Sequence, residues 1–318
     1  MRETSPTRDL VTPWEDLDAA ADHAPTAPAV TVDDARFTYQ QLRQEAQDVA
    51  RGLTALGVGE GDRVTLHMTN SRELLASYYG CFRLGAIACP LNVRLTLAEL
   101  RPMLDTIGPV AHLSQPALDT VTAEALTGVN RIVTGDLEPG KGASSWDSLL
   151  EIGRALDLPE VPQGTQPTVL FPTSGTTGTP KFVAHSTTTL AATAGTLTYE
   201  IVPGGRASLV MPPWVHAFGF YMWVSHVRRG THVIAVPDAD ADGALDCVEK
   251  YACDWWQRCC IPTLRCWRPN TDVLDKSTLF ATCVPAGMCA RTDCSKRART
   301  YSVRHCVSSG HRRRSPAH

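Results

Sequence analysis

The sequence predicts an α/β protein built from mostly parallel sheets that are flanked by helices. From the beginning of the chain to about residue 245, short apolar runs of strand length alternate with longer amphipathic runs of helical length. This alternation is typical of parallel sheets whose two faces are both covered by helices. A segment rich in glycine and threonine, residues 173–181, directly follows one of the apolar runs. Because ligands bind beyond the carboxyl ends of parallel strands, we expect a ligand at that segment.

The first helix that the pattern marks clearly begins after Thr38. Thr38 and Gln41 have the spacing of a capping box, in which each side chain accepts a hydrogen bond from the backbone of the other residue. Apolar residues then recur at helical intervals as far as Leu56, and Gly57 can end the helix in a left-handed conformation. Residues 63–68 are the next apolar run, and they predict a strand.

The same alternation continues beyond that strand. Ser71 is suited to cap a helix that extends through Phe82, and residues 86–89 predict another buried strand. Thr96 and Glu99 form a second capping box before a further helix. More strands are predicted at residues 110–113, 131–134 and 168–171, and more helices near residues 116–126 and 146–156.

The composition favours a protein that neither enters the secretory pathway nor spans a membrane. Residues 1–20 carry several charged side chains and lack the apolar core of a signal peptide. Residues 207–224 are the best candidate for a membrane span, but Pro212, Pro213 and His216 are incompatible with a helix in lipid. We therefore predict buried core at residues 207–224, and we expect a cytoplasmic protein.

Residues 173–181 combine the features of a polyphosphate-binding loop. Their glycines permit backbone conformations that are closed to other residues and let the main chain approach a ligand closely. Successive backbone N–H groups in such a loop form a concave anion-binding site, and the lysine at its end adds a positive charge. A flexible surface turn is the alternative, and the full pattern of residues disfavours it. We expect phosphate contacts from Thr173, Ser174, Gly175, Thr176, Thr177, Gly178 and Lys181.

The loop differs from a Walker loop, in which serine or threonine follows the lysine and a helix begins. Here Phe182 follows the lysine, and residues 182–184 predict a strand. Residues 173–181 instead resemble the phosphate-loop signature of the adenylate-forming superfamily. That superfamily includes acyl-CoA synthetases, aryl-CoA ligases, luciferases and the adenylation domains of peptide synthetases. This chain departs from the family pattern at Phe182, where the family usually has glycine and a freer backbone.

Three further segments resemble the same family in the same order along the chain: residues 37–42, 56–64 and 85–92. The resemblance covers most of residues 12–265, and it implies the fold of the large N-terminal domain of adenylate-forming enzymes. It also implies a chemistry of two steps. A carboxylate attacks the α-phosphorus of ATP to give an acyl adenylate and pyrophosphate, and the thiol of coenzyme A then displaces AMP.

The partners implied by the resemblance are a small-molecule carboxylic acid, ATP, Mg²⁺ and coenzyme A as co-substrate. The implied class of enzyme is an acid–CoA ligase. An adenylation domain of the peptide-synthetase type, which would pass the acyl group to a carrier protein, is the alternative within the same chemistry.

A second candidate segment follows the apolar run at residues 208–211. Residues 212–219 resemble the family segment whose histidine or aromatic residue borders the acyl pocket. The alternative is ordinary core packing at the beginning of a helix. His185 also follows the loop region, and a surface histidine is the favoured interpretation for it. The resemblance assigns the acyl pocket to Trp214, His216, Phe218 and Gly219.

The final part of the chain differs from the rest in charge and cysteine content. After residue 257 there are ten arginines and two lysines against three aspartates and no glutamate, although the whole chain has a net charge of −3. Nine of the eleven cysteines lie between Cys247 and Cys306, where hydrophobic periodicity fades. We predict a partial N-terminal adenylation domain at residues 1–257 and an aberrant, poorly ordered Cys/Arg-rich tail at residues 258–318.

Three explanations of this tail are open. Structural zinc is weakly supported, because the cysteines have irregular spacing and form no Cys-x-x-Cys pair. A nucleic-acid-binding extension lacks a recognised module or interleaved aromatic residues, so no nucleic-acid partner is expected. A shifted reading frame accounts for the enrichment in cysteine and arginine together with the loss of acidic residues, and it is the favoured hypothesis.

The resemblance also implies a glutamate that helps to hold magnesium, an aspartate that binds ribose and a C-terminal domain with a catalytic lysine. None of these can be assigned, and no glutamate follows Glu249. We therefore assign no catalytic residue and no metal ligand. We expect a truncated form with weak or no ligase activity, and a non-catalytic nucleotide-binding fragment is the alternative.

Overall fold

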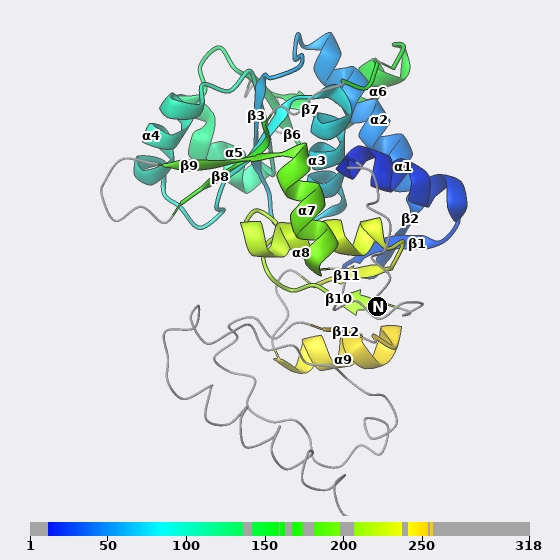
Figure 1. Cartoon of the computed structure of the whole chain (residues 1–318). Coiled ribbons are helices and arrows are strands. Elements are labelled where there is room, and N and C mark those ends of the chain that lie inside the picture. Colours follow the sequence, from blue (N-terminus) through cyan, green and yellow to red (C-terminus); the bar gives the residue numbers. More distant parts are fainter. Residues whose placement is uncertain are drawn as a thin grey trace, which may run out of the picture.

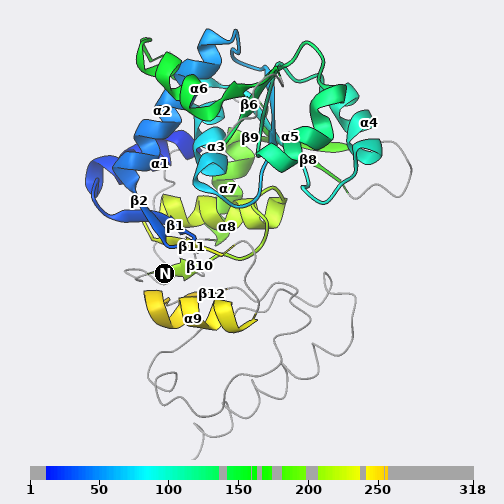
Figure 2. The same ribbon diagram turned by 180° about the vertical axis from the view of Figure 1, so that it is seen from behind.

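The computed structural model describes residues 12–135, 142–158, 160–162, 167–173, 181–197, 207–236, 241–253 and 255–256. The predicted tail at 258–318 lies outside these residues. Within them the chain forms two sheets with helices between and around them (Figures 1 and 2). The helices are α1 (Pro13–His23), α2 (Tyr39–Ala55), α3 (Arg72–Leu84), α4 (Leu97–Ile107), α5 (Pro116–Thr122), the 3-10 turn η1 (Ala123–Ala125), α6 (Trp146–Arg154), α7 (Thr187–Leu197), α8 (Ala217–Arg228) and α9 (Ala241–Tyr251).

The larger sheet of the described chain has seven strands in the order β7-β6-β5-β3-β4-β8-β9. Every neighbouring pair is parallel except β8 and β9, which form an antiparallel hairpin. The strands are β3 (Arg63–His67), β4 (Ile87–Pro90), β5 (Ala111–Ser114), β6 (Asn130–Val133), β7 (Ser144–Ser145), β8 (Pro167–Pro172) and β9 (Phe182–Ser186).

The smaller sheet has five strands in the order β12-β10-β11-β1-β2 within the same residues. It is parallel except for β2, which runs antiparallel to β1. Its strands are β1 (Pro28–Val32), β2 (Ala35–Thr38), β10 (Ser208–Leu209), β11 (Val233–Ala235) and β12 (Trp255–Trp256). The predicted mostly parallel α/β fold is therefore confirmed.

The capping residues recognised in the sequence begin the helices as predicted. The Gln41 N–H donates to the Thr38 hydroxyl at 3.2 Å, and the Thr38 N–H donates to the Gln41 side chain at 2.8 Å. The Thr96 N–H donates to the Glu99 carboxylate at 2.8 Å. Gly57 adopts a φ of +82° just after α2 ends, which is the left-handed conformation expected of a residue there.

The hairpin of β1 and β2 was not predicted from the sequence. A two-residue turn, Asp33 and Asp34, joins these strands, and both residues have positive φ angles of 46° and 68°. Turns of this geometry match the twist of an antiparallel pair, and aspartate tolerates them better than most residues. The β1 strand then joins the smaller sheet through β11, which lies far along the chain, so no local signal marks that pairing.

Aromatic side chains between α3 and α8 join the two sheets into one core. The ring centroids of Tyr78 and Phe220 lie 5.1 Å apart, and those of Tyr78 and Trp223 lie 5.4 Å apart. Phe220 also contacts Phe171 of β8 at 5.3 Å. In both views α8 lies between the smaller sheet and the elements of the larger one (Figures 1 and 2). These buried contacts set the position of α8 relative to the carboxyl ends of the larger sheet.

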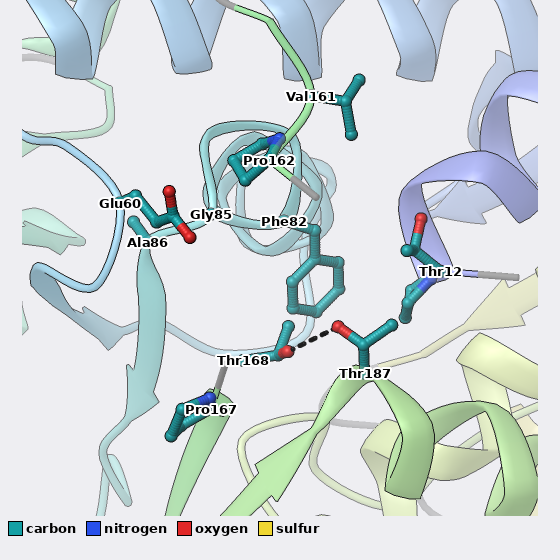
Figure 3. A pocket seen from close by; sticks show the side chains of 11 residues that line it. Thr12, Glu60, Phe82, Gly85, Ala86, Val161, Pro162, Pro167, Thr168 and Thr187 are labelled. Carbon is teal, nitrogen blue, oxygen red and sulfur yellow. Dashed lines mark hydrogen bonds between the residues drawn. The ribbon is translucent and has the colours of Figure 1, made fainter. Parts of the chain in front are cut away.

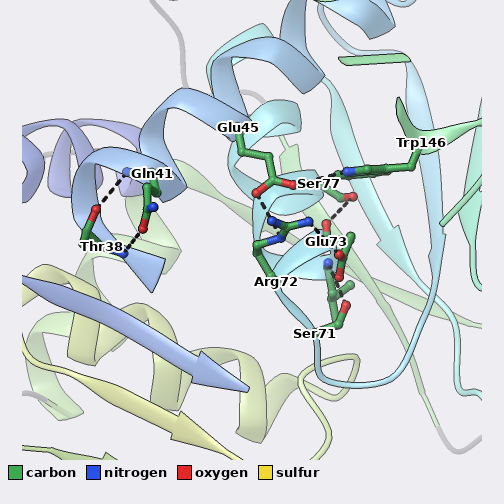
Figure 4. A network of polar contacts seen from close by, with 9 residues as sticks. Thr38, Gln41, Glu45, Ser71, Arg72, Glu73, Ser77 and Trp146 are labelled. Carbon is green, nitrogen blue, oxygen red and sulfur yellow. Dashed lines mark hydrogen bonds and ion pairs between the residues drawn. The ribbon is translucent and has the colours of Figure 1, made fainter. Parts of the chain in front are cut away.

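A polar network on the far side of α3 fixes the adjacent helices (Figure 4). The Glu45 carboxylate on α2 pairs with Arg72 at 3.2 Å and accepts a hydrogen bond from the Trp146 indole of α6 at 3.2 Å. The Arg72 guanidinium also lies 4.7 Å from the centre of the Phe37 ring. Burial raises the pKa of Glu45, while Arg72 opposes that shift. Because this network binds α2, α3 and α6 to one another, its role is structural.

Several histidines are buried in the core. Burial lowers the pKa of His67 and of His232 to about 4, and the pKa of His112 and of His226 to about 3. His112 has hydrogen-bond partners in Thr65 and Thr122, at 2.8 and 3.1 Å, whereas neither ring nitrogen of His67 has one among the described residues. An unfolded histidine takes up its proton at higher pH than these folded ones. Their contribution to stability is therefore complete above pH 6.5 and is lost as the pH falls, toward 4 for the first two histidines and toward 3 for the other two.

Replacement of His67 by leucine tests this acid sensitivity. At neutral pH we expect His67→Leu to change the free energy of unfolding by less than about 1 kcal/mol, because an apolar side chain replaces a buried polar one without partners. Between pH 6.5 and 4 the loss of stability with falling pH should become shallower, by about 1.4 kcal/mol per pH unit. Urea unfolding at a series of pH values measures both quantities. His23→Gln, at an exposed position, is the control, and an unchanged slope in His67→Leu contradicts the prediction.

Candidate functional site

The hairpin of β8 and β9 carries the predicted phosphate loop. Thr173 and Lys181 close its base: the Thr173 N–H donates to the Lys181 carbonyl oxygen at 2.8 Å, and the Thr173 hydroxyl donates to the same oxygen at 3.2 Å. Both residues are exposed. Since β8 is parallel to β4, the loop begins at the carboxyl edge of the larger sheet, where a ligand loop was expected. The intervening predicted contacts lie outside the described residues: Ser174, Gly175, Thr176, Thr177 and Gly178.

The strand predicted after the lysine is β9. Pro172 pairs with Phe182 and Phe171 pairs with Val183, so the chain returns antiparallel to β8 instead of entering a helix. The Phe182 side chain is half-buried and packs against the apolar cluster that α4 forms with β4. This packing anchors the residue that directly follows Lys181.

Asn70 ties the second candidate segment to the same sheet edge. Asn70 follows β3, and its side-chain oxygen accepts a hydrogen bond from the Trp214 N–H at 2.7 Å. Its side-chain amide donates to the Pro212 carbonyl oxygen at 3.1 Å, and the Tyr78 hydroxyl donates to the Trp214 carbonyl oxygen at 3.1 Å. The chain that leads into α8 is thus held where β3 ends. Sequence reasoning missed Asn70, because a lone asparagine after a strand has many local uses.

The four residues predicted for the acyl pocket have different environments. Trp214 is fully buried, Phe218 is half-buried against the main core, and His216 is exposed just before α8. Gly219 is buried, and a Cβ atom there would overlap the carbonyl oxygen of Pro213. A side chain at position 219 would therefore displace the segment that Asn70 holds. The structure brings the four residues together in one turn and its preceding loop.

His216 and Arg94 face a common region of this edge. Although much of the His216 side chain is exposed, the protein around it partly desolvates the ring and lowers its pKa, and the charge of Arg94 lowers the pKa further. His216 is therefore neutral near pH 7, while Arg94 supplies positive charge. Arg94 lies in the segment after β4, where its N–H donates to the Asn92 side chain at 3.0 Å. The family resemblance seen in the sequence covers residues 85–92, which include Asn92, but it does not cover Arg94.

Two cavities lie elsewhere among the residues that the structure describes. One, of about 40 Å³, lies at the amino ends of β4 and β8 beside Phe82, where Thr168 and Thr187 share a hydrogen bond of 3.1 Å (Figure 3). Such a volume admits water but not a nucleotide. The other is an open hollow of about 470 Å³ between β11 and α9, and it includes Asp34 and Tyr251. Neither includes a residue predicted for the phosphate loop or the acyl pocket.

No helix of the described chain is long and apolar enough to cross a membrane. Residues 207–224, which the sequence predicted to be core, contain β10, a short loop and most of α8. Nearly all residues of this segment are buried or half-buried, with His216 as an exposed member. The prediction of buried core there is confirmed.

Comparison with known proteins identifies relatives of this chain. The family model described as "AMP-binding enzyme" matches residues 17–268. The long-chain-fatty-acid–CoA ligase FadD13 of Mycobacterium tuberculosis is 34% identical over 219 residues, which cover 65% of this chain and 41% of the relative. The indoleacetate–CoA ligase of Aromatoleum aromaticum is 32% identical over 242 residues, with 74% of this chain and 47% of the relative covered. The chain thus spans somewhat less than half the length of these two relatives.

Solved structures show the same similarity in three dimensions. A Mycobacterium tuberculosis fatty acyl CoA synthetase superposes with a TM-score of 0.67 and 26% identity, over 77% of this chain and 49% of that one. The N-terminal domain of FACL13 from the same organism, with an inhibitor bound, superposes with a TM-score of 0.67 and 28% identity. That match covers 78% of this chain and 62% of the domain.

Removal of the Asn70 side chain tests whether its hydrogen bonds hold the second candidate segment in place. Asn70→Ala leaves the buried Trp214 N–H and the Pro212 carbonyl without their partners, so we expect a loss of about 2–4 kcal/mol in the free energy of unfolding. Urea unfolding measures it. The matched control is Asn92→Ala, at a half-buried residue that accepts one local hydrogen bond, for which we expect a loss below about 1 kcal/mol. Equal losses of unfolding free energy in the two variants would contradict this role of Asn70.

Proposed function

Because this chain belongs to the family of AMP-binding enzymes, we propose that residues 173–181 bind the phosphates of ATP beside a site for a carboxylic acid. The proposed reaction is that of an acid–CoA ligase. A carboxylate oxygen bonds to the α-phosphorus of ATP as the bond to pyrophosphate breaks. The thiol of coenzyme A then bonds to the acyl carbon and AMP leaves. The observation that carries the proposal is that the hairpin closed by Thr173 and Lys181 and the segment held by Asn70 both adjoin the carboxyl edge of one sheet.

The loop contributes positioning and charge. Lys181 is exposed at the end of the loop, and its ammonium group is proposed to bind the β- and γ-phosphates. The hydroxyl and backbone N–H groups of residues 173–178 are proposed as further donors, on the grounds of the sequence. Pyrophosphate leaves with increased negative charge, and donors held ready for that charge stabilise the transition state more than the substrate.

The acid is proposed to bind at the beginning of α8. The first N–H groups of a helix attract an anion, and α8 is long enough to have an appreciable dipole. His216, which is neutral near pH 7, can donate a hydrogen bond to a carboxylate, and Arg94 adds a positive charge nearby. Phe218 and the backbone at Gly219 would border the acyl chain, with Trp214 supporting them from the core.

ATP and coenzyme A follow from the family, and Mg²⁺ would neutralise part of the phosphate charge when bound. Among the residues that the structure describes, no group of three or more His, Cys, Asp or Glu side chains fits a metal ion. We therefore derive no step through magnesium and assign it no ligand from this chain.

A carrier protein is the second candidate for the source of the acceptor thiol, after coenzyme A. A relative from Streptomyces coeruleorubidus, 28% identical over 247 residues, is named a fatty acid–[acyl-carrier-protein] ligase. The names of the relatives cover long-chain and aromatic acids, so they favour a carboxylic acid as substrate class without choosing one acid. The location that we propose is the cytoplasm, where ATP and coenzyme A are both available.

Replacement of Lys181 tests the phosphate-binding proposal. We expect Lys181→Ala to weaken ATP binding by about tenfold or more, because a charge-assisted hydrogen bond to phosphate contributes about 1.5–3 kcal/mol. The salt dependence of binding should also become weaker. Calorimetric titration with ATP measures both. Lys250→Ala removes an exposed lysine that pairs with Asp34 on the smaller sheet, and it should leave ATP binding unchanged. Equal effects of the two substitutions would refute the assignment.

Acid-dependent exchange of labelled pyrophosphate into ATP separates catalysis from binding. Exchange by the purified chain, at a rate that rises with added carboxylic acid and falls in His216→Ala, is the result expected of a ligase. ATP binding with weak exchange, or with none, is the result predicted from the sequence for a truncated ligase. A non-catalytic nucleotide-binding fragment, the alternative, would bind ATP and show no exchange with any acid. A panel of straight-chain and aromatic acids identifies the class of substrate.

A further inference from the structure

The last residues of β3 and β5 place two buried polar side chains next to each other. In the register of these parallel strands His67 lies opposite Ser114, and Thr65 lies opposite His112. Residues two apart in a strand point to the same face, so these four side chains share one face of the larger sheet. All four residues are completely buried. A polar patch of this size inside a sheet has to satisfy its own hydrogen bonds.

The half of this patch that contains Thr65 and His112 is fully paired. The two ring nitrogens of His112 lie within hydrogen-bond distance of the Thr65 and Thr122 hydroxyls. Arg131 of β6 lies next to His112 in register, and its guanidinium donates to both carboxylate oxygens of Asp119 on α5, at 3.0 and 2.6 Å. Helix α5 thus supplies partners for this half.

The half that contains His67 and Ser114 differs. Neither ring nitrogen of His67 and not the Ser114 hydroxyl has a hydrogen-bond partner among the described residues. Burial lowers the pKa of His67 to about 4, so at neutral pH the ring has one N–H donor and one nitrogen acceptor. The hydroxyl can both donate and accept. Buried polar atoms are nearly always hydrogen-bonded, so unpaired atoms at two adjoining positions indicate a small bound molecule.

The side chains around His67 and Ser114 are apolar or already paired. Thr69 and Gln115, just beyond the two strand ends, bond to each other: the Thr69 N–H donates to the Gln115 side chain at 3.1 Å, and the Gln115 amide donates to the Thr69 hydroxyl at 3.0 Å. The register partner of Ser114 on β6 is the buried Val133. The described neighbours therefore do not supply the partners that His67 and Ser114 need.

The mixture of donors and acceptors identifies the class of bound molecule. An anion requires donors alone, and no group of three or more His, Cys, Asp or Glu side chains in the described part of the chain fits a metal ion. Water both donates and accepts, and buried waters typically make about three hydrogen bonds to groups that lack other partners.

We propose that ordered water binds between His67 and Ser114 and joins the carboxyl ends of β3 and β5. One molecule bridges the Ser114 hydroxyl and one ring nitrogen of His67. The two nitrogens of an imidazole point in different directions, so the other nitrogen takes a second molecule. This hydration site lies in the core three residues before Asn70. The proposal does not depend on the proposed function.

A double-mutant cycle at pH 7 tests the bridge. In the wild-type chain Ser114→Ala removes a partner of the water, so the equilibrium constant for unfolding should rise. In His67→Leu the water has lost its other anchor, and Ser114→Ala then removes an unpaired hydroxyl, so the constant should fall or stay unchanged. We expect the effect of Ser114→Ala to differ between the two backgrounds by a factor of about five or more. Urea unfolding of the full chain measures all four constants.

The matched control is Ser77→Ala. Ser77 is also completely buried, but its hydroxyl donates to the Glu73 carbonyl oxygen within α3 at 2.7 Å. Its effect should be the same in the wild-type and His67→Leu backgrounds to within about twofold. A crystal structure of the wild-type chain is the second measurement. We expect electron density for water within hydrogen-bond distance of both the Ser114 hydroxyl and a His67 ring nitrogen.

Each outcome decides the proposal. Coupling between the two substitutions together with density for the water supports it. Coupling without such density assigns a direct hydrogen bond between the two side chains and overturns it. An equal effect of Ser114→Ala in both backgrounds shows that no water bridges the pair, and it also overturns the proposal. If His67→Leu does not fold, the density alone decides: its presence supports the proposal and its absence overturns it.

Discussion

Helix α3 packs against helix α8 through Tyr78, Phe220 and Trp223, and this aromatic contact joins two sheets that otherwise have separate strand orders. Helix α3 connects β3 to β4 in the larger sheet, and α8 connects β10 to β11 in the smaller one. Large rings that bury extensive apolar surface tolerate little relative sliding, because the interior is closely packed. The rest of the candidate site depends on this contact, since it sets where α8 begins.

The aromatic packing sets the approximate position of α8, and hydrogen bonds at the carboxyl edge of the larger sheet fix it more closely. Asn70 holds the segment before α8 from one side, and the hydrogen bond between His185 and Tyr221 holds the helix from the hairpin side. In both cases a backbone or neutral side-chain group is the partner, so no buried charge has to be desolvated. Lys181 and Arg94 are exposed at this edge, and they are the charges that we propose to meet an anionic ligand.

Local sequence was sufficient for most individual elements. The capping pair of Thr38 and Gln41 and the positive φ of Gly57 are short-range features, and the structure has both. The strand that precedes residues 173–181 was predicted for the same reason, and the structure has it as β8. The features that the sequence did not predict have one cause: their partners lie far apart along the chain. Strand β1 is completed by β11, and His185 finds its partner on α8, so no window of sequence contains both members of either pair.

The sequence by itself determined the family and the mostly parallel α/β fold, because turns, caps and glycine-rich loops are encoded by neighbouring residues. It also gave the two candidate segments as predictions. Only the tertiary structure decided how those segments lie toward each other. It showed Trp214 as buried support, His216 as exposed and held neutral beside Arg94, and Asn70 and His185 as the contacts behind them. These properties depend on burial and on partners brought together by the two sheets, which residue order alone does not express.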